Sequence, residues 1–370
     1  MGYTDVVHVY AVARAGFIPQ LFSLRLPNPD VIYELMEKAD AKGLIFDTSS
    51  VCSFAGAPVP TYPAIPSDVI RSGSEVLSSI TENLAGSDTF CIFHTSGSTS
   101  GSPKVIRCSY SWLDNIITKA DFLCQRRNSA RQDVTTWVGS MSHIAQTFSK
   151  SQSSSVVMHR FLYSTLVLIG ALHNGACVIQ PSQFPFSPRE LIDMVERCSL
   201  NCLRLFGTFL SNHIRNARSN PALLSALKSL DEAFFCGIGI APEDEAFALE
   251  HGIRLRNVFG STEVGAMLYT PDGERFMRQL PGTQYAFWPI DGEKSAPTAG
   301  AGPRNANNTA LLELIILRES ADCPDRALCH ADGNYHTGDL FQQVMPGSFV
   351  FRGRNDDWIK SENSLRCDTK

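Results

Sequence analysis

A loop rich in serine, threonine and glycine is the stretch of this sequence best suited to chemistry. Residues 93–104 read Phe-His-Thr-Ser-Gly-Ser-Thr-Ser-Gly-Ser-Pro-Lys. Glycine lets the backbone approach an anion closely, successive N–H groups and hydroxyls donate to phosphoryl oxygens, and lysine adds a mobile positive charge. The loop therefore predicts a binding site for the phosphates of ATP, with a flexible serine-rich hairpin as the alternative.

This loop differs from the P-loop of nucleotide triphosphatases. In that motif a Gly-Lys-Ser or Gly-Lys-Thr sequence opens a helix. Here Gly101 is followed by Ser102-Pro103-Lys104 and then by the strand-like residues 105–107. A P-loop NTPase is therefore excluded.

Three more motifs follow the loop along the chain. They are residues 257–263 (Asn-Val-Phe-Gly-Ser-Thr-Glu), 335–340 (Tyr-His-Thr-Gly-Asp-Leu) and 352–360 (Arg-Gly-Arg-Asn-Asp-Asp-Trp-Ile-Lys). In this order the four motifs resemble the adenylate-forming, or AMP-binding, superfamily. Residues 10–20 and 26–29 further resemble the adenylation domain of fungal nonribosomal-peptide-synthetase-like adenylate-forming reductases. The resemblance covers nearly the whole chain, but only the large N-terminal subdomain of the family.

The resemblance implies a set of residues for ATP and Mg²⁺. The loop residues expected at the β- and γ-phosphates are Thr95, Ser96, Gly97, Ser98, Thr99, Gly101 and Lys104. Thr262 would contact the α-phosphate, and Glu263 would bind Mg²⁺, a hard cation that prefers carboxylate oxygens. The remaining nucleotide contacts are Asn257 and Phe259 at the adenine, Gly260 and Ser261 beside them, Asp339 at the ribose hydroxyls, and Arg354 at the ribose or a phosphate. The implied catalytic residues are Lys104, His143, Thr262 and Glu263.

The same resemblance implies a pocket that binds the carboxylic acid. His143 matches a position beside the substrate carboxylate, and the expected lining is Phe235, Gly237, Val258, Ala266 and Met267. Relatives that activate amino acids carry an aspartate next to the histidine position, where this chain has Ile144. The pocket therefore favours an aryl, keto or fatty acid over an α-amino acid.

Taken singly, these residues have simpler explanations. Glu263 could be a carboxylate in the first turn of a helix, Asp339 a turn residue, Arg354 and Asp356 a surface ion pair, and His143 a structural histidine. The shared order of the motifs favours the functional interpretation.

The predicted domains are an adenylation large subdomain over residues 1–354, and the hinge at Asp356 with the start of the C-terminal subdomain over 355–370. By the resemblance, we expect the chain to begin later than the family's large subdomain does and to lack the C-terminal subdomain with its catalytic lysine. The expected acceptor is the phosphopantetheine of a carrier protein or coenzyme A, and a synthetase or reductase module is a further expected partner. The alternatives are a truncated remnant that binds nucleotide or a partner without turnover, and a stand-alone acyl-CoA ligase.

Residues 146–160 form a serine-rich segment between His143 and an apolar stretch. In the relatives the two are almost directly joined, so we interpret the segment as an artefact of the gene model or of splicing. Transcripts that carry these codons at ordinary abundance would contradict this hypothesis.

The elements that must position these residues alternate between helices and strands. Apolar spacing predicts helices over 31–42, 109–124, 188–198, 210–217, 221–230 and 242–250. Buried strands are expected at 44–46, 89–93, 176–180, 203–206, 233–236, 255–258 and 311–317. The alternation predicts an α/β fold of mostly parallel sheets flanked by helices, plus a smaller β-rich part over 311–352.

Composition and charge narrow the classes of partner that the protein could bind and the cellular compartment in which it works. The net charge of −5 offers no basic field for nucleic acid. The longest apolar run, Phe161–Leu172, is 12 residues, whereas a membrane span needs about 20. The 11 cysteines contain no Cys-x-x-Cys pair, which indicates reduced thiols and a cytoplasmic protein, and zinc binding by Cys323, Cys329 and His330 lacks a second ligand pair.

Overall fold

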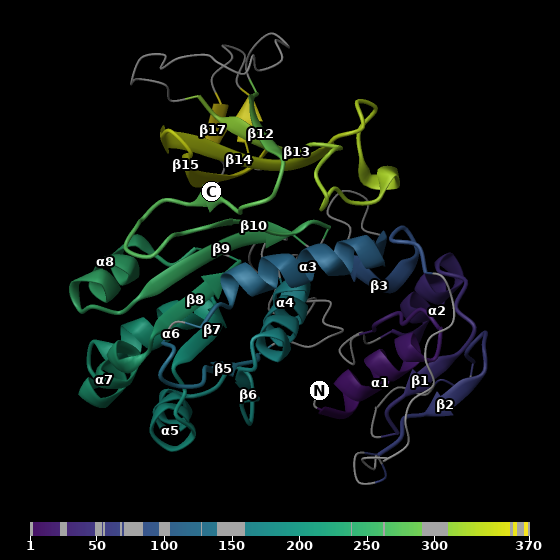
Figure 1. The fold of residues 1–370 in the computed structure, drawn as a ribbon, viewed down its shortest axis with the longest axis horizontal. Helices are drawn as coiled ribbons and strands as arrows, with labels where there is room; N and C mark the ends of the chain where they lie inside the picture. The colour runs from purple at the N-terminus through teal and green to yellow at the C-terminus, as the bar shows by residue number, and fades with distance from the viewer. Residues whose placement is uncertain are drawn as a thin grey trace. The chain divides into compact units, whose positions relative to one another are not determined.

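The chain is described here by a computed structural model that covers residues 3–22, 28–48, 54, 56–66, 69, 84–95, 104–126, 128–138, 160–237, 239–261, 263–290, 310–355, 358–360 and 366–368. It divides into two compact units (Figure 1). The first comprises Met1–Leu255 and Gly260–Gly265, and the second Arg256–Phe259 and Ala266–Lys370.

Parallel strands form the centre of the first unit. They are β5 (Val134–Thr136), β6 (Cys177–Ile179), β7 (Cys202–Phe206) and β8 (Glu232–Cys236). Their order is β8-β7-β5-β6, and each neighbouring pair is parallel. Every residue of β7 and β8 is buried, as expected for strands covered on both faces.

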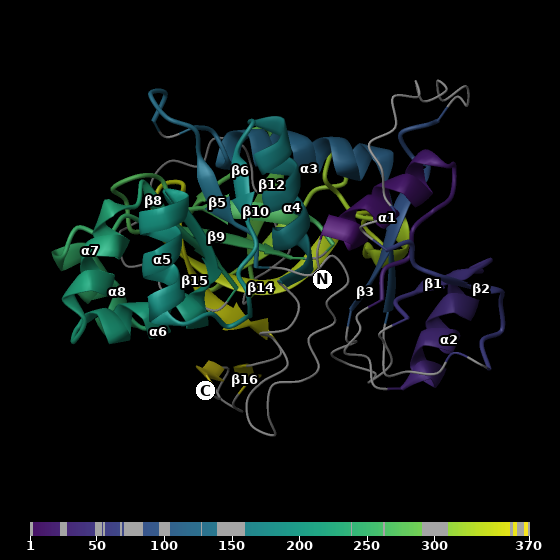
Figure 2. The ribbon, with the colours of Figure 1, turned by 90° about the horizontal axis from the view of Figure 1, so that it is seen from below.

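Helices cover these strands. They are α3 (Tyr110–Leu123), α4 (Arg160–His173), α5 (Pro188–Cys198), α6 (Gly207–Ala217), α7 (Pro221–Ser229) and α8 (Pro242–Glu250). Figure 2 shows α3 and α4 on one side of the strands and α5 and α6 on the other. Side-chain caps fix two helix starts: Ser187 accepts a hydrogen bond from the Glu190 N–H, and Asn220 accepts one from the Leu223 N–H.

The core of the first unit lies between α5–α8 and the strands β7 and β8. Its fully buried members include Leu191, Leu203, Leu205, Leu210, Ile214, Leu223 and Leu227. Burying each such side chain contributes about 1.5–3 kcal/mol. This packing holds the carboxyl ends of β7 and β8 in fixed positions.

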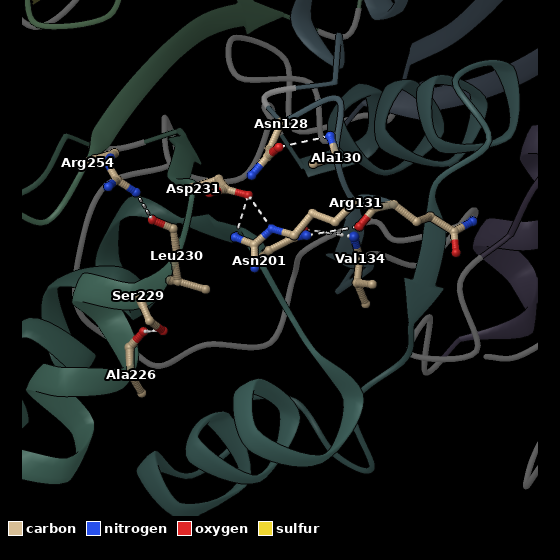
Figure 3. Close-up of polar contacts among 11 residues, drawn as sticks. Asn128, Ala130, Arg131, Val134, Asn201, Ala226, Ser229, Leu230, Asp231 and Arg254 are labelled. Carbon is tan, nitrogen blue, oxygen red and sulfur yellow. Dashed lines mark hydrogen bonds and ion pairs between the residues drawn. The ribbon is translucent and has the colours of Figure 1, made fainter.

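Polar side chains join the amino ends of the same strands (Figure 3). Arg131 Nη2 donates to Asp231 Oδ2 at 2.7 Å, and the Val134 N–H donates to Asn201 Oδ1 at 2.8 Å. Asn201 also donates to the Gln132 carbonyl at 3.0 Å. The segments leading into β5, β7 and β8 are therefore tied together at this edge.

The N-terminal part of the first unit carries smaller elements. They are α1 (Tyr3–Arg14), α2 (Pro29–Lys38), the parallel pair β1 (Leu44–Phe46) and β2 (Thr61–Pro63), and the antiparallel pair β3 (Thr89–Thr95) and β4 (Lys104–Ser109). The predicted phosphate loop connects β3 to β4, and residues 96–103 lie outside the described residues.

Antiparallel strands dominate the second unit. Strand β9 (Leu255–Ser261) enters it, followed by β10 (Gly265–Tyr269) and β11 (Arg278–Gln279). A four-stranded sheet has the order β12-β13-β14-β15, with β12 (Tyr285–Pro289), β13 (Leu312–Ile316), β14 (Tyr335–Met345) and β15 (Ser348–Arg354). A 3₁₀ turn, η2 (Arg326–Leu328), precedes β14, and β16 (Trp358–Lys360) pairs with β17 (Arg366–Asp368).

The α/β fold with an added β-rich part is confirmed, and most predicted elements are found. The helix predicted over 31–42 is too long: α2 ends at Lys38, because Asp40 takes a left-handed φ of 56° that stops the helix. The strand predicted over 255–258 is too short, since β9 reaches Ser261. The helix α1 was not predicted, and its β-branched valines explain why.

Two remaining features are a membrane-spanning helix, which was not expected, and the serine-rich segment. Within the described ranges, no helix is long and apolar enough to cross a membrane. Residues 146–159 of the serine-rich segment lie outside the described residues, so the hypothesis about their origin stays a prediction.

Candidate functional site

The ribose end of the predicted nucleotide site lies in the second unit, on neighbouring strands. Asp339 of β14 and Arg354 of β15 face each other in the strand register. Arg354 Nη1 donates to Asp339 Oδ1 at 3.4 Å, with 3% of the aspartate side chain and 21% of the arginine side chain exposed. The carboxylate thus lies next to a cation and is almost entirely buried.

Asp339 is a strand residue, not a residue of a simple turn. It follows Gly338, whose φ of 72° is a conformation that favours glycine. The Asp339 N–H donates to Thr337 Oγ1 at 3.0 Å, and that hydroxyl donates to the Leu314 carbonyl at 2.8 Å. The register of β14 is irregular here, so Thr337 holds Asp339 at a bulge.

The predicted adenine residues lie on β9 in the same unit. Phe259 is buried, and its ring centroid lies 5.1 Å from that of Phe341 and 5.0 Å from that of Phe351. Asn257 is half-buried, and its Nδ2 lies 3.7 Å from Met277 Sδ. An aromatic cluster therefore surrounds the position, and stacking of Phe259 on adenine stays a prediction.

Glu263, the predicted magnesium ligand, lies in the first unit, in the turn between β9 and β10. The alternative that Glu263 lies in the first turn of a helix is wrong, because a turn leads directly into strand β10 here. Glu263 is 7% exposed, and its Oε2 has no hydrogen-bond partner among the residues that the structure describes. A buried carboxylate oxygen without a partner is unfavourable unless a cation or donor completes it, so Glu263 fits a hard cation such as Mg²⁺.

Two groups in the first unit adjoin Glu263. The buried Lys119 donates from Nζ to the carbonyl of Val264 at 2.9 Å and so holds the turn. Burial, the Cys91 thiol and the charge of Glu263 together raise the pKa of Cys108 well above its usual value. Because Cys108 lies on β4, the carboxylate is close to the strand that leaves the phosphate loop at Lys104.

A buried histidine at the end of β3 was not predicted from the sequence. His94, on β3 at the start of the loop sequence, is 2% exposed and stacks on Phe22 at a centroid distance of 4.9 Å. Gln20 Nε2 lies 2.9 Å from His94 Nε2 and also donates to the Leu35 carbonyl at 2.9 Å. Burial lowers the pKa of His94 to about 4, so its ring is neutral near pH 7. A histidine inside an apolar strand was the available signal.

The expected acid pocket is only partly described. Phe235 and Gly237 lie at the carboxyl end of β8 in the first unit, the end at which parallel sheets bind ligands. Val258, Ala266 and Met267 are buried in the second unit. That these residues line one pocket stays a prediction.

The other predicted residues fall outside what the structure describes. They are His143, Thr262, Asp356 and the loop residues Ser96, Gly97, Ser98, Thr99 and Gly101, together with the side chains of Thr95 and Lys104. Gly260 and Ser261 continue β9, and the Ser261 hydroxyl is buried without a hydrogen-bond partner in the described part of the chain.

Zinc binding near Cys323 gains no support. The sulfur atoms of Cys323 and Cys329 are 3.8 Å apart. Among the described residues, however, no three His, Cys, Asp or Glu side chains form a group that could hold a metal ion. Burial and the nearby Cys329 raise the pKa of Cys323 to about 12, which keeps the thiol protonated near pH 7.

The sequence matches a known enzyme family and is similar to individual proteins from a fungus and a bacterium. The AMP-binding enzyme family matches residues 5–300. The AMP-binding domain-containing enzyme iboA of Amanita muscaria is 35% identical over 100% of this chain and 68% of its own length. The medium/long-chain-fatty-acid–CoA ligase FadD17 of Mycobacterium marinum is 26% identical over 88% of this chain, which spans 59% of that relative.

Solved structures share the fold. ATP-bound MatB from Rhodopseudomonas palustris matches with a TM-score of 0.72 and 17% identity, over 100% of this chain and 69% of that one. O-succinylbenzoate coenzyme A synthetase from Bacillus subtilis, in complex with ATP and magnesium, matches with a TM-score of 0.70 and 14% identity, over 98% and 70%. At these identities the likeness shows the fold alone.

Proposed function

Because the chain belongs to the AMP-binding enzyme family, we propose that it uses ATP to activate a carboxylic acid as an acyl-adenylate. In this reaction a carboxylate oxygen attacks the α-phosphorus of ATP and pyrophosphate leaves. The observation that carries the proposal is Glu263, a buried carboxylate with an oxygen that has no hydrogen-bond partner in the described structure, close to the strand that follows the phosphate loop. Such a carboxylate is a suitable ligand for the Mg²⁺ that accompanies ATP.

Some residues of this chain would bind the nucleotide and the acid, and others would stabilise the negative charge of the phosphates. Lys104 and the loop would bind the β- and γ-phosphates and stabilise the leaving pyrophosphate. Thr262 would orient the α-phosphate, and His143 would lie beside the acid. Glu263 would hold Mg²⁺, which supplies positive charge to the phosphate oxygens when bound. Asp339 would accept both ribose hydroxyls, because its buried carboxylate has two oxygens.

We propose an aryl, keto or fatty acid as the substrate, because the expected pocket lining is apolar and Ile144 offers no charge for an amino group. Fatty acids are the substrates named for FadD17, and iboA comes from a fungus. We propose a place in fungal secondary metabolism. A thioester with coenzyme A or with a carrier protein would follow, and adenylate-forming reductases are the proposed setting.

Acid-dependent exchange of labelled pyrophosphate into ATP tests the proposal, with aryl, keto, fatty and amino acids as substrates. We expect exchange with one of the first three classes and none with amino acids. Glu263→Gln should abolish it, whereas the control Glu250→Gln, at an exposed position on α8, should not. Saturable ATP binding without exchange by the parent chain would instead support a non-catalytic nucleotide-binding remnant. Release of AMP that depends on coenzyme A would support a stand-alone ligase.

We further propose that residues 1–354 form the large adenylation subdomain and that Asp356 is the hinge for a C-terminal subdomain. Asp356→Pro tests this in a chain that includes a C-terminal subdomain, because proline fixes φ and would prevent rotation at this residue. Exchange should persist in the variant while thioester formation is lost. Unchanged thioester formation would rule the hinge out.

A further inference from the structure

The Thr-Gly-Asp segment of β14 is held by side chains and not by a regular strand ladder. Glu313 pairs with Leu340, and Ile315 pairs with His336, so Leu314 alone stands opposite the segment 337–339. This places extra residues on β14, which is a bulge. Backbone groups in a bulge lose their regular partners and need others.

Glu313 supplies one of these partners. Its Oε1 accepts the Gly338 N–H at 3.0 Å, and its Oε2 lies 3.7 Å from His336 Nδ1. The Glu313 side chain is 19% exposed, so this hydrogen bond is largely shielded from water. A hydrogen bond to a charged acceptor is stronger than one between neutral groups.

The conformation that Glu313 fixes determines where Asp339 lies. Gly338 has a φ of 72°, and a Cβ added to it would lie 3.3 Å from Arg354 Nη2. The backbone therefore passes close to the guanidinium that also contacts Asp339. A change in the Gly338 peptide would move Asp339 relative to Arg354.

We propose that Glu313 is a positioning residue for the ribose end of the nucleotide site, acting through the Gly338 N–H to hold the bulge that presents Asp339. The inference rests on the proposed function, because it takes Asp339 as the acceptor of the ribose hydroxyls. Glu313 itself touches no part of the nucleotide in this proposal.

Ribose selectivity is the readout that a general loss of stability would not change. Titration calorimetry compares the affinities of the full chain for AMP and 2′-deoxy-AMP. The parent chain should prefer AMP, and Asp339→Ala should abolish the preference. Glu313→Ala should reduce the preference at least fivefold, since Asp339 would no longer be held in place. Glu313→Gln keeps an oxygen that accepts the Gly338 N–H and should retain most of the preference.

Two controls separate the possible outcomes. Glu319→Ala removes an exposed glutamate that pairs with Arg318 and should leave the preference unchanged. In the double variant Asp339→Ala, Glu313→Ala, the second change should have no further effect on the preference, because both act through one group. An unchanged preference in folded Glu313→Ala overturns the inference, as does a parent chain without ribose preference. The readout is binding, so a parent chain that shows the preference but no pyrophosphate exchange overturns the proposed function alone.

Discussion

Two buried glutamates should respond in opposite directions to the same substitution. Glu263 is 7% exposed and has an oxygen without a hydrogen-bond partner in the described part of the chain, whereas Glu232 is 4% exposed and pairs with Arg204 Nη2 at 2.9 Å. Glutamine has nearly the shape of glutamate and carries no charge. Replacing each residue by glutamine therefore isolates the effect of the charge.

The expected magnitudes follow from these environments. Leaving a buried polar group unsatisfied costs about 1–3 kcal/mol, and more for a charge. Because glutamine is easier to bury, Glu263→Gln should raise the free energy of unfolding by about 1 kcal/mol in the absence of Mg²⁺ and nucleotide. Glu232→Gln breaks the buried ion pair with Arg204, which should lower the free energy of unfolding by about 3–5 kcal/mol.

Urea denaturation followed by circular dichroism measures both effects, provided that the slope of free energy against urea concentration is unchanged. The same preparations are assayed for pyrophosphate exchange, which Glu263→Gln should lose while it gains stability. A Glu263→Gln variant that is less stable than the parent chain by 1 kcal/mol or more would show that the carboxylate serves the fold and would refute the reasoning.

Three further predictions concern other parts of the molecule. Asp339→Asn should raise the KM for ATP about tenfold or more with a smaller change in kcat, because the lost contact is to the ribose; exchange kinetics measure this, and a loss confined to kcat would contradict it. His94 and His213 have pKa values lowered by burial to about 4, against about 6.5 in the unfolded chain. The stability linked to each histidine is therefore complete above pH 6.5. It is lost progressively, by about 3 kcal/mol, as the pH falls from 6.5 through 4. The free energy of unfolding, measured from pH 7 to pH 4, should fall less steeply in each of the variants His94→Asn and His213→Asn than in the parent chain. An equally steep fall would contradict the lowered pKa of that histidine. Iodoacetamide at pH 8 should alkylate Cys323, with its pKa of about 12, more slowly than the exposed Cys198, and mass spectrometry of peptides detects the order.

Much of the fold was predictable because the relevant signals are local. The helices Pro188–Cys198 and Pro242–Glu250 have the bounds that the sequence predicts, since proline at the first position and apolar spacing act within a few residues. The buried strands β7 and β8 were also recognised from short apolar runs. By contrast, the end of α2 depends on a left-handed φ at Asp40, which no periodicity indicates.

The candidate site was predictable in its residue types and their order. The motif around Asp339 indicated a nucleotide carboxylate, because the residue types and their sequence order are properties of the chain alone. The sequence did not indicate that Glu313 accepts the Gly338 N–H, since that contact joins residues 25 positions apart across a bulge. Nor did it indicate the support of His94 by Gln20, 74 positions away.

The sequence by itself thus determined the family, the local elements and the chemical types at the site. Only the tertiary structure decided which charges have partners: Glu232 pairs with Arg204 across neighbouring strands, while an oxygen of Glu263 has no hydrogen-bond partner in the described structure. The reason is physical. Burial and hydrogen bonding depend on groups brought together from distant parts of the chain, and these set the free energy of a charge.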